Sequence, residues 1–306
     1  AASDVYKRQR LNSFLYLFCI LSVFASCVQK PDSSVEDWNR TFINTKKLIS
    51  EACLDRELIL GRPFLIQYVD SSLLIYDDIG DSLFLLVDLK ENDRVYRFGQ
   101  KGEGNNEFLQ VFAFCNMKSD SILGVYDAYK HELREINLDK VKRGEMNFPV
   151  VFKDTLSSIK LSPTKYDAYL GLGFYESNML SLTDNSIGSK FFFEYPYKDS
   201  REKAISNRLR GMAYQGTLCS NRSLDKFLYA VCSAPIFMLF SVNKDGIEKT
   251  YELIGGYPNY VTEETGEYRS APMSADNKMS FTMAYATDNY IYLLYSGCLL
   301  YTSDAA

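Results

Sequence analysis

Two polar stretches in the second half of the chain carry the residue types best suited to holding a ligand. Residues 195–210 contain five basic side chains and a short segment that Asp199 could cap as a helix. Residues 255–278 contain three tyrosines, whose rings could stack on a sugar or a peptide. Guanidinium and ammonium groups pair with carboxylates. The pattern predicts a surface for an acidic glycan or an acidic protein segment, made by Arg201, Lys203, Arg208, Arg210, Tyr257, Tyr260 and Tyr268. The alternative, two solvated loops without a ligand, stays open.

The sequence offers little for catalysis. His131 is the single histidine, so nucleophilic mechanisms that need one would have to use it, and no nucleophile motif lies nearby. A multi-histidine metal site is excluded for the same reason. Asp77, Asp78 and Asp81 form an acidic cluster, but their spacing misses the calcium-loop pattern and suits a hairpin turn. We therefore predict no catalytic residue, no metal ligand and no cofactor, with calcium as the open alternative.

The spacing of the cysteines and the net charge argue against two further kinds of function, zinc binding and nucleic-acid binding. Cys53, Cys115, Cys219 and Cys232 show no CxxC spacing, which argues against zinc. Cys219 and Cys232 flank an expected hairpin loop and could pair, but we favour buried free thiols. The net charge of −5 supplies no basic excess for phosphate contacts, so we expect no nucleic-acid partner.

The N-terminal region predicts export and attachment to a membrane. An apolar run over residues 11–26 is too short to span a bilayer comfortably, and it suits a secretory signal. It ends in residues 24–27, Phe-Ala-Ser-Cys, which resemble a bacterial lipobox. We predict a lipoprotein signal peptide over 10–26, lipidation at Cys27 and a polar tether over 27–40. An ordinary signal peptide with a chance cysteine, or an uncleaved anchor, stays open.

The two ends of the chain are set apart from the rest. Residues 1–9 and 298–306 match the translations of a common transposon-based sequencing adapter and of its reverse complement. We expect both to be sequencing-adapter artefacts and the natural protein to continue beyond Gly297.

The elements that must position the ligand-binding residues are short strands in a repeat. Residues 64–99 contain four apolar runs separated by Asp, Ser, Gly and Asn turns. The pair Tyr76-Asp77 recurs 50 residues later as Tyr126-Asp127, and weaker echoes follow towards residue 295. Such a period is typical of propeller blades. We predict an all-β, six-bladed β-propeller over residues 41–297, incomplete at its C-terminal end, with residues 42–60 supplying a strand that closes the ring.

Three segments together resemble a known family. They are Gly61-Arg62-Pro63-Phe64 before the first blade, residues 98–108 (Phe-Gly-Gln-Lys-Gly-Glu-Gly-Asn-Asn-Glu-Phe) after it, and Leu294-Tyr295-Ser296-Gly297. They are similar to the TolB-like six-bladed propeller lipoproteins of Bacteroides-type bacteria, in which Pro-Gly usually stands where this chain has Asn105-Asn106. The resemblance implies the fold and the cell envelope as compartment. It implies no shared activity.

The function favoured by these patterns is a lipid-anchored envelope β-propeller, in the outer membrane, with a non-enzymatic binding or scaffold role. Its partners would be the membrane, through Cys27, and a glycan or protein on one ring face. Whether it faces the periplasm or the outside is open. The alternative is a metal-dependent hydrolase or lactonase that acts in the propeller channel.

Overall fold

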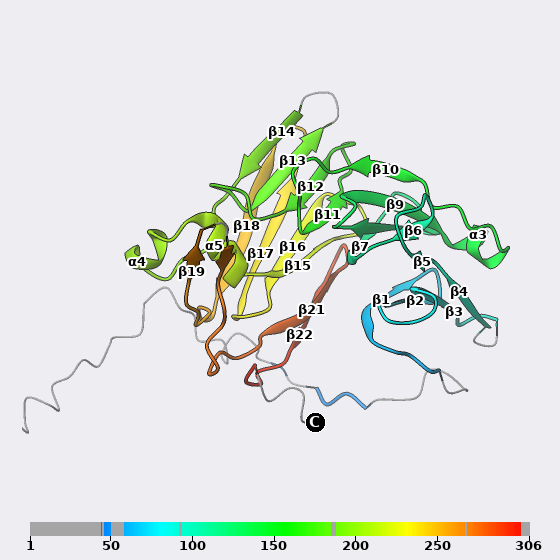
Figure 1. Cartoon of the computed structure of the whole chain (residues 1–306), viewed down its shortest axis with the longest axis horizontal. Coiled ribbons are helices and arrows are strands. Elements are labelled where there is room, and N and C mark those ends of the chain that lie inside the picture. The colour runs from blue at the N-terminus through cyan, green and yellow to red at the C-terminus, as the bar shows by residue number, and fades with distance from the viewer. Residues whose placement is uncertain are drawn as a thin grey trace, which may run out of the picture.

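The chain folds into a series of small antiparallel sheets. The computed structural model describes residues 44, 46–49, 58–91, 94–184, 188–266 and 268–300. Four four-stranded sheets follow one another along this part of the chain, and each pairs strands that are neighbours in sequence. Figure 1 shows the sheets arranged around an arc.

The first two sheets follow the strand boundaries expected from the repeat. The first sheet contains β1 (Pro63–Val69), β2 (Ser72–Asp77), β3 (Phe84–Asp88) and β4 (Arg94–Phe98). The second contains β7 (Val111–Asn116), β8 (Ile122–Asp127), β9 (Glu132–Asn137) and β10 (Val150–Lys153). The parallel pair β5 (Gln100–Lys101) and β6 (Glu107–Phe108) lies between them, and the helix α3 (Leu138–Lys142) follows β9.

Two further sheets and a hairpin complete the described part. The third sheet contains β11 (Lys160–Pro163), β12 (Tyr169–Leu172), β13 (Leu180–Asp184) and β14 (Gly188–Phe192). The fourth contains β15 (Gly216–Ser220), β16 (Lys226–Val231), β17 (Ile236–Val242) and β18 (Ile247–Ile254). The last pair is β21 (Phe281–Ala286) and β22 (Ile291–Tyr295). The insertions between sheets are α4 (Ser200–Lys203), α5 (Asn207–Ala213), β19 (Glu263–Thr265) and β20 (Tyr268–Ser270).

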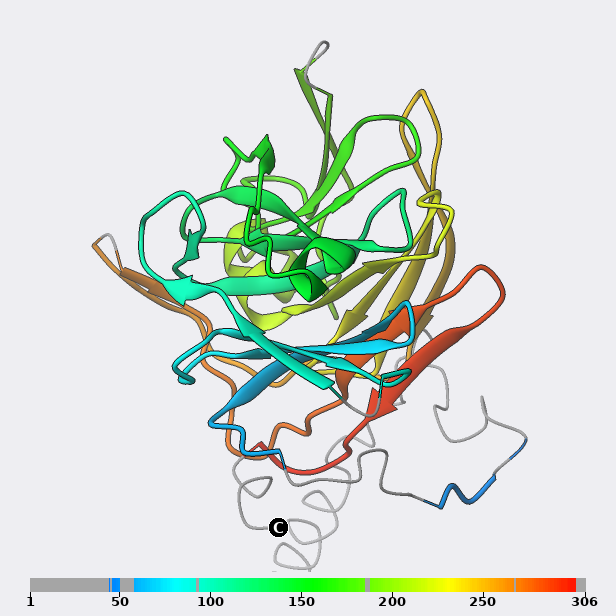
Figure 2. The same cartoon turned by 90° about the vertical axis from the view of Figure 1, so that its right-hand side faces the viewer.

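The first strand of each sheet lies at the centre of the arc. β1 contacts β7, β7 contacts β11, β11 contacts β15, and β15 contacts β21. A series of four-stranded meanders with their first strands innermost is the architecture of a β-propeller. The predicted fold is therefore confirmed, with four blades and part of a fifth. The described sheets do not close into a ring, and the first sheet and the β21–β22 hairpin are the two ends of the arc (Figure 2).

The ring-closing strand suggested for residues 42–60 is absent from the part of that segment that the structure describes. Residues 58–60 form no strand. Leu58 and Leu60 instead pack beside the buried Ile75 and Leu85 of the first blade. Between residues 42 and 57 the structure describes only residues 44 and 46–49. Phe42 and Cys53 therefore lie outside the described residues, and so does Cys27.

The repeated Tyr-Asp pair connects each blade to the chain that precedes and follows it. The Asp77 carboxylate accepts hydrogen bonds from the backbone N–H of Gly61 (2.6 Å) and of Arg62 (2.8 Å). In the next blade the Asp127 carboxylate accepts in the same way from Leu109 (2.6 Å). One aspartate thus joins the end of the second strand to the segment that leads into the first strand.

The tyrosine of the pair reaches the following blade. The Tyr126 hydroxyl lies 2.8 Å from Asp154 Oδ2 and 2.9 Å from the Ser158 carbonyl oxygen. Asp154 and Ser158 precede β11, the first strand of the third blade. Burial, together with Asp154, raises the pKa of Tyr126 well above its ordinary value, so the hydroxyl remains a donor.

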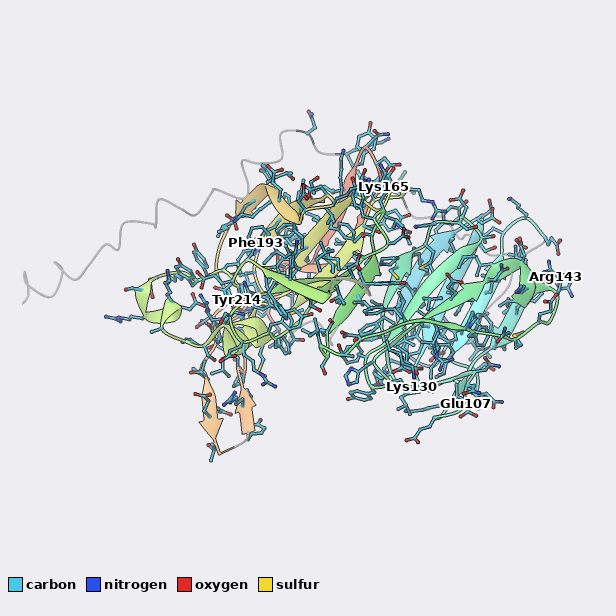
Figure 3. The ribbon with its side chains drawn as sticks, turned by 90° about the horizontal axis from the view of Figure 1, so that it is seen from above. Glu107, Lys130, Arg143, Lys165, Phe193 and Tyr214 are labelled. Atoms are coloured by element: carbon cyan, nitrogen blue, oxygen red, sulfur yellow. The ribbon has the colours of Figure 1, made fainter. Side chains whose placement is uncertain are left out.

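The glycine-rich segment after the first blade is a packed turn. Gly99 has φ +73°, and a Cβ there would lie 2.5 Å from the Phe84 ring. The Lys130 ammonium donates to the carbonyl oxygens of Gly104 (2.9 Å) and Glu107 (3.0 Å), and Figure 3 shows Lys130 and Glu107 close together. Phe108 is fully buried, as expected for a residue that anchors the next strand.

Among the described cysteines of the propeller, Cys115, Cys219 and Cys232 are free thiols. Burial raises the pKa of Cys115 and of Cys219 to about 12. The expectation of free thiols is confirmed for these three positions, of which Cys115 is buried and Cys219 and Cys232 are half-buried. In the described part of the chain no helix is long and apolar enough to cross a membrane.

Candidate ligand-binding face

The two long polar stretches lie on the same face of the propeller. One connects β14 to β15 and the other connects β18 to β21, so both run from the outermost strand of a blade to the innermost strand of the next. Helix α5 contacts β20, and Figure 1 places α4, α5 and β19 together. The Tyr260 hydroxyl donates to Glu202 Oε1 (2.8 Å), which joins the two stretches directly.

Glu202 is held in place by the helix that carries it. The Asp199 side chain caps α4, as predicted, by accepting from the N–H of Arg201 (2.9 Å) and of Glu202 itself (3.0 Å). The same Glu202 Oε1 also accepts from the Tyr214 hydroxyl (2.9 Å). Burial raises the pKa of Tyr214 and of Tyr260 well above the ordinary tyrosine value, and Glu202 adds to the effect. Both hydroxyls therefore stay protonated and donate to the carboxylate.

The predicted site residues divide into exposed and buried groups. Arg201, Lys203 and Arg208 are exposed on the helices, and Tyr268 is exposed on β20. Tyr257 and Tyr260 are half-buried and pack against the apolar core of the third and fourth blades. The structure thus brings the exposed and the half-buried residues together on one face, but not every predicted site residue is a surface residue.

Arg210 differs from the expectation of a surface cation. Its exposed fraction is 2%, because this side of α5 packs onto the blades. The guanidinium donates to Glu194 Oε2 (2.8 Å) and lies 5.2 Å from the centre of the Tyr197 ring. Lys203 Nζ lies 5.0 Å from the centre of the same ring. Arg210 therefore supports the segment that leads into α4 and does not project into solvent.

A pocket with a volume of about 570 Å³ opens beside α5. It is bordered by the connection before β11, the turn between β12 and β13, strand β14 and helix α5. The side chains that line it include three aromatic rings, one cation and one carboxylate. The full lining is Leu156, Ser157, Phe174, Tyr175, Glu176, Ser177, Asn178, Phe191 and Arg208. Arg208 is the member of this lining that the sequence predicted.

Tyr175 is the best fixed of the aromatic residues in the pocket. Its hydroxyl lies 2.7 Å from Ser158 Oγ and 2.9 Å from Ser181 Oγ. Its ring meets Phe191 edge to face, with 5.2 Å between the ring centres. Burial raises the pKa of Tyr175 to about 12, so the hydroxyl is neutral and cannot serve as a base near pH 7.

Asn207 joins the two halves of the pocket. Its Nδ2 donates to the carbonyl oxygens of Tyr175 (3.1 Å) and Asn178 (2.8 Å), while its Oδ1 accepts from the N–H of Tyr195 (2.7 Å). The Asn207 amide is buried; its bond with Tyr195 is buried as well, and its bonds to Tyr175 and Asn178 are partly buried. These bonds fix α5 against the turn between β12 and β13, two of the segments that border the pocket.

The acidic cluster considered for calcium is already used by the protein. Asp77 binds backbone N–H groups, and Asp78 forms a two-point ion pair with Arg62, at 2.7 Å and 2.5 Å. Among the described residues no group of three or more His, Cys, Asp or Glu side chains is placed to hold a metal ion.

The arrangement of the blades defines the class of the protein as a β-propeller. A family model described as TolB-like 6-blade propeller-like matches residues 41–304 of this chain. The chain therefore belongs to this family. The resemblance found in the sequence is thereby confirmed.

Solved structures similar to this chain include two from Bacteroides. An exported-protein candidate from Bacteroides fragilis shares 13% identity at a TM-score of 0.48, covering 78% of this chain and 74% of that chain. A member of the DUF4221 family from Bacteroides vulgatus shares 11% identity at a TM-score of 0.39, covering 72% of this chain and 62% of that chain. No match was found among curated protein sequences.

Proposed function

We propose that this protein is a non-enzymatic binding propeller of the cell envelope, whose pocket beside α5 holds an acidic glycan. One observation carries the proposal: the pocket combines the rings of Tyr175 and Phe191 with the guanidinium of Arg208. Aromatic faces suit the apolar side of a sugar ring, and a guanidinium binds a carboxylate through two hydrogen bonds. The exposed Arg201 and Lys203 on the same face extend the positive surface.

A binding role suits the chemistry of the pocket better than glycan cleavage. Glycoside hydrolysis ordinarily uses two carboxyl groups on either side of the scissile bond. Glu176 is the one carboxylate in the lining of this pocket. The neutral hydroxyl of Tyr175 is tied to two serines, and it is better suited to donating a hydrogen bond than to taking a proton.

Calorimetry with an acidic and a neutral polysaccharide tests this proposal. We expect the protein to bind polygalacturonate and not dextran. Arg208→Ala should weaken binding by at least about tenfold, or about 1.4 kcal/mol. Phe191→Ala should weaken it similarly because it removes a stacking surface. Arg143→Ala is the matched control, since this exposed arginine follows α3 and lies far from Tyr214, which ends α5 (Figure 3). Equal affinities of Arg208→Ala and Arg143→Ala would reject the site.

We further propose that the protein is anchored to the outer membrane through a lipid on Cys27. Support comes from the apolar run before this cysteine and from the lipobox-like residues 24–27. Metabolic labelling with a fatty-acid analogue should mark the wild-type protein and Cys19→Ser, a matched control within the signal segment. Cys27→Ser should take up no label. Label retained on Cys27→Ser would contradict the anchor.

A further inference from the structure

A second pocket, with a volume of about 400 Å³, opens at the outer strands of the second blade. It is bordered by the glycine-rich turn between β5 and β6, by the start of β9, by the segment that leads into β10 and by β10 itself. We call it the β10 pocket. It shares no lining residue with the pocket beside α5. Its polar lining consists of Asn105, Asn106, Glu132, Arg134, Asn147 and Lys153.

A buried ion pair on β9 links two sides of the β10 pocket. Nε and Nη2 of the buried Arg134 donate to Glu132 Oε2 (3.2 Å and 2.6 Å). Arg134 Nη1 donates to the carbonyl oxygen of Asn105, on the glycine-rich turn, and to that of Phe148 (3.0 Å), in the segment before β10. The guanidinium is therefore engaged by the protein itself, and Glu132 balances its charge.

Asn106 adds a further link between the same two segments. Its Nδ2 donates to the Met146 carbonyl oxygen (3.1 Å), and its Oδ1 accepts from the N–H of Phe148 (3.1 Å). The bonded residues are 40 and 42 positions apart in the sequence. These bonds fasten the glycine-rich turn to the segment before β10.

Three other side chains of the β10 pocket are available to a ligand. Asn105 and Asn147 are exposed, and their side-chain amides make no hydrogen bond to another described residue. The Lys153 side chain is 75% exposed, and its Nζ lies 3.7 Å from Glu132 Oε1. Because Arg134 already balances Glu132, the charge of Lys153 makes the lining positive overall. Amide N–H groups and an ammonium suit a ligand that carries hydroxyls and carboxylates.

The β10 pocket and the pocket beside α5 are neighbours on one face of the propeller. Lys153 ends β10, and Leu156, which lines the pocket beside α5, lies three residues further along the connection to β11. Their Cα atoms are at most about 11 Å apart, the span of three residues of extended chain. Connections from one blade to the next border both pockets, so both lie at the same ends of the strands. One extended ligand can therefore reach from one pocket to the other.

We propose that a single acidic glycan chain occupies both pockets, with one carboxylate on Arg208 and a further carboxylate on Lys153. This rests on the proposed function of the pocket beside α5, and it narrows the ligand from an acidic glycan of any length to an extended polyanion. The amides of Asn105 and Asn147 hold hydroxyl groups of the sugar beside Lys153. Two linked contacts bind more tightly than either contact alone, because the second forms within the complex.

Amide hydrogen exchange of the full chain with polygalacturonate locates the ligand. We expect slower exchange in residues 174–178, beside α5, and also in residues 102–108 and 145–149, around the β10 pocket. With the polymer at about ten times its Kd, exchange through local opening should slow by up to about tenfold. Dextran should protect neither region. Protection limited to residues 174–178 would overturn the second contact and leave the proposed function intact, whereas protection in neither region would reject both.

Calorimetry with charge variants tests the role of Lys153. Lys153→Ala should weaken the binding of polygalacturonate about threefold to fivefold, the size expected for an exposed ion pair. It should also reduce the protection of residues 102–108 and leave residues 174–178 protected. Lys244→Ala is the matched control, because it removes the same charge from the exposed turn between β17 and β18, at the strand ends opposite those that connect the blades. Equal affinities of the two variants would overturn the second contact.

Discussion

At the scale of single residues, the aspartates that end the second strands of the first two blades accept hydrogen bonds from several backbone N–H groups. Asp127 is fully buried and accepts from backbone N–H groups on both sides of its strand, including those of Leu109 (2.6 Å) and Tyr129 (3.1 Å). Asp127→Ala leaves these donors without an acceptor. We expect a loss of about 1–3 kcal/mol in the free energy of unfolding, measured by urea denaturation. Asp81→Ala, at an exposed turn, is the control and should change stability little.

Two buried carboxylates of the first blade, Asp77 at the end of β2 and Asp88 at the end of β3, predict a dependence of stability on pH. Burial raises the pKa of Asp77, but hydrogen bonds from the N–H groups of Arg62 and Gly61 outweigh it and leave the pKa below its usual value. For Asp88, burial is likewise outweighed, by the Lys142 ammonium and by backbone N–H groups. A pKa that is lower in the folded state stabilises the fold at all pH values above the unfolded pKa of about 3.9. This stabilisation is lost as the pH falls through the folded pKa.

Urea denaturation between pH 7 and pH 3 measures that loss. As far as these two carboxylates are concerned, we expect the urea midpoint to stay nearly constant from pH 7 to about pH 5 and to decrease at lower pH. Asp88→Asn should weaken the fall, because one of the responsible carboxylates is gone. An unchanged pH profile in Asp88→Asn would show that the ion pair with Lys142 does not contribute.

At the scale of elements, Glu202 connects the α4 helix to the segment that carries β19 and β20. Glu202→Ala removes the acceptor of both Tyr214 and Tyr260. We expect amide hydrogen exchange in residues 257–270 to become at least about tenfold faster, since local opening is opposed by fewer contacts. Glu248→Ala, at an exposed position on β18, should leave this exchange unchanged. Equal exchange in the two variants would mean that the hydroxyl contacts do not hold the hairpin.

Strand elements were predictable from the sequence because each blade is specified locally. The spacing of Tyr76-Asp77 and Tyr126-Asp127 located two second strands, and turn residues bounded the rest. The cap at Asp199 was predictable for the same reason. The pocket was not, because its lining comes from four segments whose meeting depends on how blades pack. The burial of Arg210 was missed because it depends on which side of α5 faces the core.

At the scale of the whole molecule, Asn116 joins three blades near the ring centre. Gln67 Nε2 of the first blade donates to Asn116 Oδ1 (3.3 Å), and Asn116 Nδ2 donates to the Ser220 carbonyl oxygen of the fourth blade (2.9 Å). Asn116→Ala should lower the free energy of unfolding by about 1–3 kcal/mol, measured by chemical denaturation. Asn147→Ala, at an exposed position, is the matched control. Similar stabilities of the two variants would show that the central amide is dispensable.

The pairing of sequence neighbours within every blade also bears on how the protein is made. Each meander pairs strands that are neighbours in sequence, so a blade can form while the ribosome is still adding the next one. The contact from Tyr126 to Asp154 spans 28 residues, whereas that from Asn116 to Ser220 spans 104. Assembly should therefore proceed blade by blade from the N-terminus. The central amide contact would be made late, after most of the described chain has been synthesised.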